Sequence, residues 1–333
     1  MGTSARKRLM DWYGRVRRDL PWRATRDPWH ILLSEVMLQQ TRVATVIPYY
    51  LRFVERFPTA ESMARAPEQE VLTLWAGLGY YTRARNLRRA AQELVKRADF
   101  PKSVEEIRAL PGVGEYTAAA VASIVHGDAA AAVDGNVLRV MSRYTADAGE
   151  IRALPTRQRL REAAEKLLDR RRPGDFNQAL MELGATVCLP RNPLCAQCPL
   201  VATCEGRRQG VEKQLPVKIR QNRTELSRLH LLIVEKHGRY LVRRSEAGGG
   251  GLAGFWEAPE RRQLDGLQGL RGLGTFRHSI TTTNYQVEVS KATVPRKPDG
   301  FVWKSLGQLA GMPVSTMTKK AFRLAGLTVT KIK

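Results

Sequence analysis

Acidic residues are scarce in this sequence relative to basic ones. Its 333 residues contain 32 Asp and Glu against 55 Lys and Arg, which gives a formal net charge of +23 at pH 7. A surplus of this size is typical of proteins that bind a polyanion, most often nucleic acid. A solvated basic surface without such a partner is the alternative, and charge alone does not decide between the two.

Long apolar runs are also missing. No stretch approaches the roughly 18 consecutive apolar residues that a membrane-spanning helix needs. The first 20 residues lack the continuous apolar core of a secretory signal, and Arg6 stands where a myristoylation signal requires Ser or Thr. We therefore expect a soluble protein with no membrane partner.

Cysteine is confined to one short segment, where Cys188, Cys195, Cys198 and Cys204 have the spacing C-x6-C-x2-C-x5-C. In a reducing compartment such clustering favours metal ligation over disulfide bonds. Four thiolates suit either a tetrahedral zinc ion or a cubane iron–sulfur cluster. Structural zinc sites more often carry two short C-x2-C knuckles and this loop has one, but spacing by itself leaves both metals open.

The periodicity of apolar residues changes along the chain. Spacings of three and four residues, typical of helices, recur through four segments: 44–57, 68–76, 86–95 and 159–168. Short strand-like runs follow later: LHLLIVE, RYLVRRS, FWEAP, YQVEVSKATV and FVWKS. We predict an all-α domain over residues 1–205, a basic linker over 206–226 and a smaller α+β domain over 227–333, with a last helix near 316–325.

The segment LPGVG, Leu110–Gly114, predicts a tight turn between the helical segment VEEIRAL and a second helix. Glycines permit unusual backbone angles and expose N–H groups, so Gly112, Val113 and Gly114 are candidate donors to a DNA phosphate. Such contacts position a protein on DNA without reading sequence. The alternative is a helix–helix corner with no ligand.

Two carboxylates are candidates for chemistry. Glu35 lies in WHILLSEVMLQQ, a helix that is apolar on almost every face. Burial there would raise the pKa above about 4.3 and let the group act as a general acid, although an exposed or Arg-paired Glu fits the sequence equally well. Asp134 in VDGNV fits a helix N-cap, and it fits equally a carboxylate that stabilises positive charge developing on a sugar.

Several motifs resemble one family. The LPGVG turn, VDGNV and the cysteine loop look like the endonuclease III superfamily of DNA base-excision glycosylases. Within it, SEVMLQQT (34–41), GLGYYTRARN (77–86) and FNQALMELGATVC (176–188) resemble MutY-type adenine DNA glycosylases. The resemblance implies an all-α helix–hairpin–helix glycosylase domain with a [4Fe–4S] loop at 188–204, followed by a Nudix-like α+β domain.

The resemblance also implies a reaction, the removal of adenine mispaired with 8-oxoguanine or guanine. Glu35 matches the residue that protonates the adenine ring, Asp134 the catalytic aspartate, and Asn136 a hydrogen-bonding neighbour of both sugar and carboxylate. Bifunctional members have a lysine where this chain has Tyr116, and a phenol cannot form a Schiff base. We therefore expect a monofunctional enzyme that leaves an abasic site, with Tyr116 positioning the aspartate or a water.

Base extrusion needs residues that fill the gap in the duplex and residues that hold the base. By resemblance, Gln40 and Tyr80 intercalate or contact the orphan base, with Thr41 and Leu78 beside them. Arg23 and Gln178 match positions that line the adenine pocket.

The C-terminal segment RYLVRRSEAGGGGLAGFWEAP resembles the start of a Nudix-like domain, but no REx2EE acidic cluster follows it. Nucleotide hydrolysis is therefore not expected. In the family this domain recognises 8-oxoguanine through a Phe-Ser-His loop. Here one alignment places Thr281 at the hydroxyl contact, and another uses His278 itself.

The resemblance implies double-stranded DNA with A:8-oxoguanine or A:G mispairs as the partner. We expect a monomer, located in the bacterial cytoplasm and associated with the nucleoid through DNA. The alternatives are a T:G or pyrimidine-lesion glycosylase of the same superfamily, and a non-catalytic DNA-binding protein.

Overall fold

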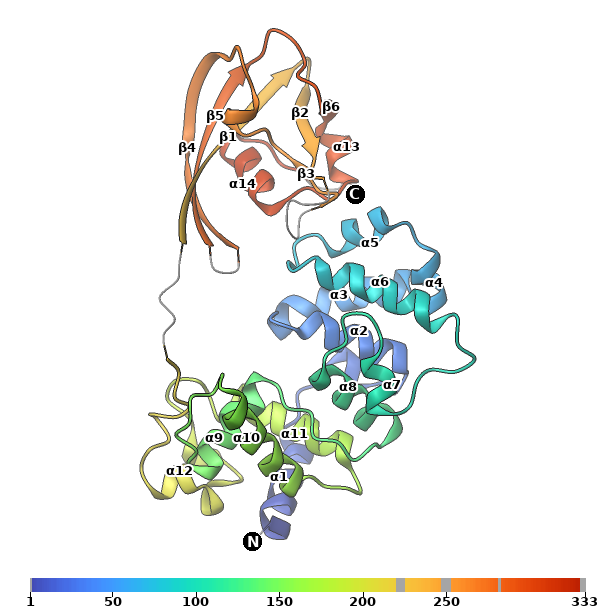
Figure 1. Ribbon diagram of the computed structural model, residues 1–333, viewed down its shortest axis with the longest axis vertical. Coiled ribbons are helices and arrows are strands. Elements are labelled where there is room, and N and C mark those ends of the chain that lie inside the picture. The colour runs from blue at the N-terminus through green and yellow to red at the C-terminus, as the bar shows by residue number, and fades with distance from the viewer. Residues whose placement is uncertain (1, 220–224, 247–252, 281–282, 330–333) are drawn as a thin grey trace. The chain divides into compact units, whose positions relative to one another are not determined.

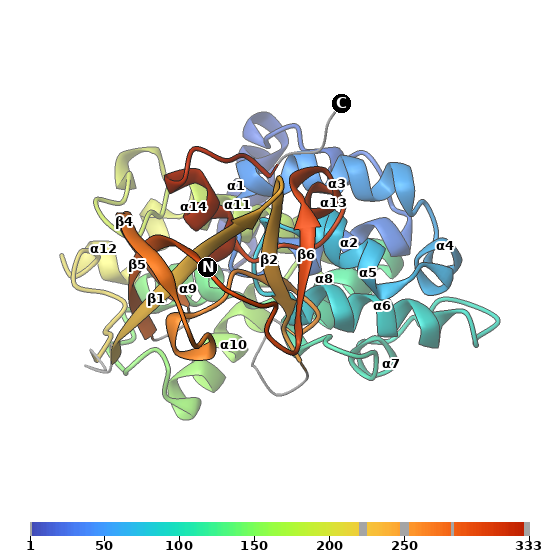
Figure 2. The same ribbon diagram turned by 90° about the horizontal axis from the view of Figure 1, so that it is seen from above.

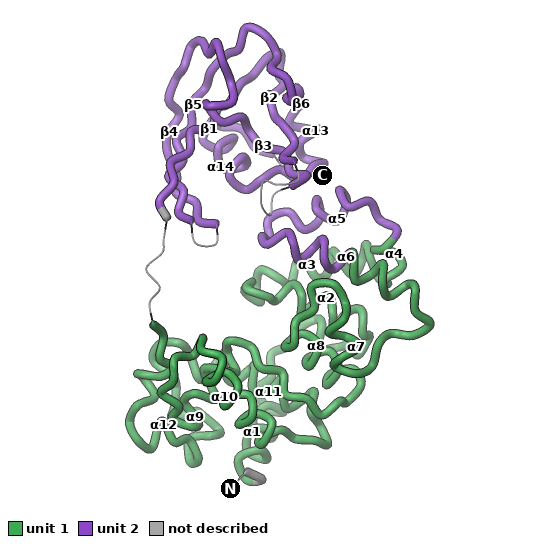
Figure 3. Tube along the Cα trace, in the orientation of Figure 1, with its two compact units in different colours: residues 1–64, 89–220 green, residues 65–88, 221–333 purple. Residues whose placement is uncertain are grey.

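The computed structural model describes residues 2–219, 225–246, 253–280 and 283–329. The chain forms two compact units (Figure 3), one of residues 1–64 with 89–220 and one of residues 65–88 with 221–333. Compactness thus places residues 65–88 with the C-terminal part of the chain. The domain boundaries predicted from chain order, at 205 and 226, stay a prediction.

The first unit is helical, as expected. Its helices are α1 (Gly2–Val16), α2 (Pro28–Leu38), α3 (Val43–Arg56), α4 (Ala60–Arg65), α7 (Val104–Arg108), α8 (Glu115–Val121), α9 (Gly135–Thr145), α10 (Leu154–Leu167), α11 (Pro173–Thr186) and α12 (Glu205–Arg208). Helices α1, α9, α10 and α11 share one hydrophobic core that includes Leu9, Met141, Leu160 and Phe176 (Figure 1). No helix in the described part of the chain is long and apolar enough to span a membrane.

Helix α2 begins sharply because its first residues suit a helix start. The carboxylate of Asp27 accepts a hydrogen bond from the His30 N–H at 2.9 Å, and Pro28 occupies the first helical position. Eight of the eleven residues of α2 are buried, namely Trp29 and all those from Ile31 to Met37. A carboxyl carried on this helix therefore enters an apolar interior.

The predicted helix–hairpin–helix is formed by α7 and α8. Ser103 and Glu106 cap α7 reciprocally, and the turn closes with Gly112 at φ 76°. Gly114 is the N-cap residue of α8. The hairpin delivers Tyr116, two residues after Gly114, to the first turn of α8.

The second unit contains α5 (Glu68–Trp75), the first part of α6 (Thr82–Leu94) and a sheet. The sheet comprises β1 (Glu225–Lys236), β2 (Arg239–Arg244), β3 (Trp256–Glu257), β4 (Gln268–Ile280), β5 (Thr283–Thr293) and β6 (Phe301–Ser305), with α13 (Leu306–Ala310) and α14 (Thr316–Leu324). The strand order is β3-β2-β1-β5-β4. Strand β6 pairs with β2 and lies beside it in Figure 2. Strands β1 and β5 are parallel and pack against α14 around Leu231, Val287 and Phe322. This α+β architecture was predicted.

Strand β4 was not predicted, because its sequence QGLRGLGTFRHSI is rich in glycine and most of its residues are exposed. Its partner supplies the order: β4 pairs antiparallel with β5 from Gln268 to Ile280, and Ile280 pairs with Thr283. Helix α13, a single capped turn after β6, was also missed.

Candidate active site

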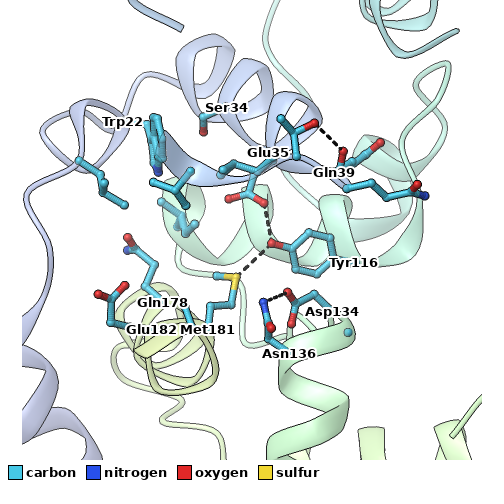
Figure 4. A pocket seen from close by; sticks show the side chains of 18 of the residues that line it. Trp22, Ser34, Glu35, Gln39, Tyr116, Asp134, Asn136, Gln178, Met181 and Glu182 are labelled. Atoms are coloured by element: carbon cyan, nitrogen blue, oxygen red, sulfur yellow. Dashed lines mark hydrogen bonds between the residues drawn. The ribbon is translucent and has the colours of Figure 1, made fainter. Parts of the chain in front are cut away.

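A cavity of about 830 Å³ opens within the first unit between α2, α8, α9 and α11 (Figure 4). Eight of the predicted site residues line it: Arg23, Glu35, Gln40, Thr41, Tyr116, Asp134, Asn136 and Gln178. These residues come from segments more than a hundred positions apart in the sequence, and all of them belong to the same compact unit.

Glu35 is 5% exposed and carries the most perturbed carboxyl of the cavity. Burial raises its pKa to about 7, and the nearby charge of Asp134 adds to that effect, while the hydrogen bond from Tyr116 and the charge of Arg23 oppose it. The predicted elevation of this pKa is present. Glu35 therefore holds a proton over part of its population at neutral pH.

The Tyr116 hydroxyl donates a hydrogen bond of 2.7 Å to Oε2 of Glu35 and lies 3.0 Å from Sδ of Met181. We had expected this hydroxyl to position the aspartate or a water. In the structure its carboxylate partner is Glu35 (Figure 4), since α2 and α8 pack side by side. Burial, with the nearby charges of Glu35 and Asp134, raises the pKa of Tyr116 well above its ordinary value, so the phenol stays protonated.

Asp134 is the N-cap residue of α9, as its first interpretation suggested. Its Oδ1 accepts from the Val137 N–H at 2.7 Å, and its Oδ2 accepts from Nδ2 of Asn136 at 3.1 Å. The same carboxylate borders the cavity, so the cap and the cavity position are compatible. Burial raises the pKa of Asp134, although these hydrogen bonds oppose the rise.

Asn136 is held in turn by Arg139. The Arg139 guanidinium donates to Oδ1 of Asn136 at 2.9 Å, to the Gly184 carbonyl at 2.7 Å and to the Cys188 carbonyl at 2.9 Å. Asn136 is thereby oriented with its amide group toward Asp134. One arginine thus ties the cavity to the start of the cysteine loop.

The cavity wall opposite Asp134 contains a buried ionic cluster that sequence reasoning missed. Glu182 is 1% exposed, and its carboxylate accepts charged hydrogen bonds from Arg18 Nε at 2.6 Å and from Arg23 Nη2 at 2.8 Å. Burial alone would raise the pKa of Glu182, but the hydrogen bonds from both arginines outweigh it and lower that pKa. A usable signal was present, because Glu182 follows Gln178 by four residues on α11 and so shares its face.

Gln178 itself accepts a hydrogen bond from the Tyr13 hydroxyl at 3.3 Å. Trp22 is buried beside it and meets Tyr50 edge-on at 5.4 Å. At the other end of the cavity α2 ends at Leu38, and Gln40 follows with a left-handed backbone at φ 55° and an exposed side chain. Thr41 is half-buried, with its N–H bonded to the Leu38 carbonyl.

Comparison with known proteins assigns this chain to a family. Residues 33–170 match the HhH-GPD superfamily of base excision DNA repair proteins. The chain is 34% identical over 402 aligned residues to the adenine DNA glycosylase of Mus musculus, in a match that covers 97% of this chain and 78% of that protein. The chain belongs to the adenine DNA glycosylase family.

Two further matches describe the extent of this relationship. The adenine DNA glycosylase of Homo sapiens is 46% identical over 224 residues, which are 64% of this chain and 41% of that protein. The chain therefore spans about two fifths of the human relative in that alignment. Among solved structures, a thermostable thymine-DNA glycosylase is similar with a TM-score of 0.56 at 32% identity, covering 62% of this chain and 98% of that one.

In this member of the adenine DNA glycosylase family, the predicted phosphate donors of the hairpin differ from one another. Gly112 and Gly114 are exposed. Val113 is buried, and its N–H donates to the Leu110 carbonyl at 3.1 Å, because the turn closes through that bond. The side of the turn open to a ligand is therefore the glycine backbone.

All four cysteines lie in the segment that runs from the end of α11 to the start of α12. Burial raises the pKa of Cys198 to about 12; a backbone hydrogen bond at Leu200 opposes that rise, and the charges of the other three cysteines add to it. Arg143 is buried beside the loop and donates to Sγ of Cys188 at 3.3 Å and to the Leu189 carbonyl at 2.6 Å. Among the described side chains, no three His, Cys, Asp or Glu residues converge as ligands of a metal ion do.

Three predicted residues lie in the described part of the second unit. Tyr80 is 47% exposed with φ 50°, whereas Leu78 is only 5% exposed and packs inward. His278 lies on β4 with Nδ1 3.4 Å from Nζ of Lys320, and burial, with the charge of Lys320, lowers its pKa. Thr281 lies outside the described residues.

Proposed function

We propose that this protein is a monofunctional DNA glycosylase that flips adenine out of mispairs with 8-oxoguanine or guanine and hydrolyses its glycosidic bond. The observation that carries the proposal is the cavity itself, where Glu35, whose pKa is raised to about 7, and the carboxylate of Asp134 face one space. A proton donor for the leaving base and a carboxylate for the sugar are the two groups that this hydrolysis needs.

The reaction follows from the roles of these groups. Glu35 transfers its proton to a ring nitrogen of adenine, and the bond between the base and C1′ breaks with its electron pair moving onto the base. Positive charge then develops on the sugar, and Asp134 stabilises that charge or traps it covalently. Water adds at C1′ and yields its proton to a carboxylate, which restores the site.

Adenine recognition fits the opposite wall. We propose that Arg23 and Gln178 contact the edge of the base, with Glu182 fixing the arginine through the ion pair described above. Because Arg18 and Arg23 are both bound to Glu182, the wall is rigid before a substrate arrives. Gln40, Thr41 and Tyr80 are proposed to fill the gap that the extruded nucleotide leaves.

Tyr116 supports base removal without strand cleavage. A lysine at this position would supply an amine for attack on C1′, whereas the phenol donates to Glu35 and stays protonated. The expected product is an abasic site in an otherwise intact strand.

A [4Fe–4S] cluster is the cofactor that we propose for Cys188, Cys195, Cys198 and Cys204, on the strength of their spacing. Four neighbouring thiols are available, and the Arg143 guanidinium donates toward one sulfur, which suits an anionic cluster. When bound, the cluster would stabilise the loop between α11 and α12 and thereby the basic groups it carries. Absorbance near 400 nm together with iron and zinc analysis tests this assignment.

The substrate is proposed to be duplex DNA, bound by a monomer through the hairpin backbone at Gly112 and Gly114. One observation favours a second candidate, a thymine glycosylase acting on T:G, because a solved thymine-DNA glycosylase shares 32% identity with the helical part. The alignment with the mouse adenine DNA glycosylase extends over nearly the whole chain, including the C-terminal part, and supports adenine.

A single-turnover assay tests the proposal on duplexes with A opposite 8-oxoguanine, G, C or T, and with T opposite G. We expect adenine release that needs alkali for strand scission and gives no borohydride-trapped adduct. Thymine release, or a trapped Schiff base, would contradict the proposal.

The matched variants are Glu35→Gln and Glu93→Gln. Glu93 is an exposed glutamate of α6 paired with Lys96, so its change leaves base release intact. Glu35→Gln is expected to lower the rate at least about 100-fold while duplex binding persists. Equal rates for the two variants would show that Glu35 is not the proton donor.

A further inference from the structure

Tyr80, proposed above to enter the DNA, has a backbone conformation that must be held in place. It is a non-glycine residue at φ 50°, a region that costs energy and persists only under external constraint. Its ring is largely exposed, so the constraint does not come from burial of Tyr80 itself.

One side of the constraint lies in the preceding turn. The Trp75 indole N–H donates to the Gly79 carbonyl at 3.0 Å, and Arg83 Nη2 donates to the same oxygen at 3.1 Å. The Arg83 guanidinium also lies 5.4 Å from the centroid of the Tyr80 ring, in a cation–π contact. These bonds fix the residue before Tyr80 and support one face of its ring.

The other side comes from the C-terminal part of the chain. Tyr81, next to Tyr80, is 6% exposed, and its ring centroid lies 4.0 Å from that of the fully buried Phe255. Phe255 is held by its own backbone, because its carbonyl accepts from the Ser245 N–H at 2.7 Å. The aromatic pair therefore fixes the residue after Tyr80.

Two polar contacts reinforce this junction within the second unit. Arg85 donates to the carbonyl of Ala253, two residues before Phe255, and Arg244 Nη2 of β2 donates to Oε1 of Gln69 at 3.2 Å. Residues 65–88 and the sheet thus make ring, backbone and side-chain contacts inside one compact unit.

We infer that Phe255 is a specificity-determining positioning residue: through its ring contact with Tyr81 it sets the direction in which Tyr80 enters the duplex. The contact couples the position of Tyr80, the residue that fills the gap, to the domain that carries β4 and β5. Discrimination between bases opposite adenine then depends on Phe255, although Phe255 touches neither base. This inference rests on the proposed function, since it concerns how that activity selects its substrate.

The test measures single-turnover adenine release by the full-length protein from duplexes with A opposite 8-oxoguanine and A opposite G. The variants are Phe255→Leu, Tyr81→Leu and their combination. Loss of an aromatic pair changes an equilibrium or rate constant by about a factor of two to ten. Each single variant should therefore lower the ratio of the rate opposite 8-oxoguanine to the rate opposite G by roughly that factor. The combination should lower it no further, since either change removes the same contact.

Phe322→Leu is the matched control, because Phe322 is a fully buried ring of the same unit whose partner is Tyr240 at 5.3 Å. It should leave the ratio unchanged. An equal fall in this control, or additive effects of Phe255→Leu and Tyr81→Leu, would show general loosening of the domain and overturn the inference.

Amide hydrogen exchange over residues 77–83 of the free protein gives a readout that does not depend on lesion preference. Exchange should become faster in Phe255→Leu and stay unchanged in Phe322→Leu. Unchanged exchange in Phe255→Leu would overturn the inference alone. Failure of the unmodified protein to release adenine from either duplex would instead overturn the proposed function, and the inference with it.

Discussion

The hydroxyl of Tyr116 and the carboxylate of Glu35 share a 2.7 Å hydrogen bond at the wall of the cavity. Two opposing effects therefore act on one proton: burial raises the pKa of Glu35, and the phenol, by donating to the ionised form, lowers it. Their balance at about 7 places the titration of Glu35 at the pH where the protein would have to work.

Tyr116→Phe removes the lowering effect and keeps the ring. The pKa of Glu35 should rise, so the loss of activity on the alkaline side of the pH–rate profile should move to higher pH. A hydrogen bond to a charged group is worth about 1.5 kcal/mol, which corresponds to roughly one pH unit. Single-turnover rates measured across pH 5–9 (roughly the range set by the pKa of about 7) check this shift.

Tyr13→Phe is the control for that experiment, because the Tyr13 hydroxyl bonds Gln178 in the same cavity wall rather than Glu35. The alkaline limb of the pH–rate profile of Tyr13→Phe should not shift. A limb that moves to lower pH in Tyr116→Phe would show that the phenol favours the protonated carboxyl, contrary to the geometry.

The burial of Glu35 also predicts a pH-dependent stability. The folded protein binds this proton more tightly than the unfolded chain does, since its pKa rises from 4.5 to about 7 on folding. The free energy of unfolding should therefore fall as pH increases from about 4.5 to 7, by roughly 3 kcal/mol. In Glu35→Gln this component of the pH dependence should be missing, as denaturant unfolding at pH 5 and 8, roughly either side of that window, would report.

The sequence allowed the helical and α+β parts, the hairpin and eight of the residues that line the cavity to be predicted, because each has a local signal. The apolar run around Glu35 indicates burial, and Asp134 before Gly135 indicates a helix start, which it is. The role of Glu182 was not predicted, because its ion pairs are with Arg18 and Arg23, which lie about 160 positions away in the sequence.

Strand β4 escaped for a related reason. Its glycine-rich first half is mostly exposed and has no alternating pattern, and the ladder with β5 makes it a strand. The aromatic contact of Tyr81 with Phe255 is likewise invisible in sequence, since neither residue differs locally from an ordinary core aromatic.

Glu182→Gln should weaken the cavity wall. The amide keeps the shape but leaves two arginines without a charged partner, so we expect a loss of about 1–3 kcal/mol in the free energy of unfolding and weaker binding of the adenine-containing duplex. The ion pairs lower the pKa of Glu182, so the unmodified protein should lose their contribution as pH falls below about 4.5, its ordinary pKa, and the variant should lack this loss.

Asp147→Asn is the matched control for Glu182→Gln. Asp147 accepts two hydrogen bonds from Arg159, at 2.8 and 2.9 Å, but that arginine is exposed to solvent. Its removal should therefore cost much less stability and leave duplex binding unchanged. Equal losses in the two variants would mean that the buried ion pairs of Glu182 stabilise the fold no more than an exposed ion pair does.

Gly184→Ala tests the contact between α11 and Asn136, the residue that hydrogen-bonds Asp134, the proposed catalytic aspartate. A Cβ at position 184 would stand 2.8 Å from Cβ of Asn136, so α11 and α9 must separate and Asn136 must shift relative to Asp134. We expect a loss of about 1–3 kcal/mol in stability, as for other overpacked sites, together with a lower single-turnover rate.

Gly14→Ala in α1 is the control, because a Cβ there meets nothing within 4 Å and should stabilise the helix by roughly 0.5–1 kcal/mol. Thermal unfolding and adenine release of both variants would check the prediction, and a Gly184→Ala protein with unchanged rate would show that Asn136 tolerates displacement.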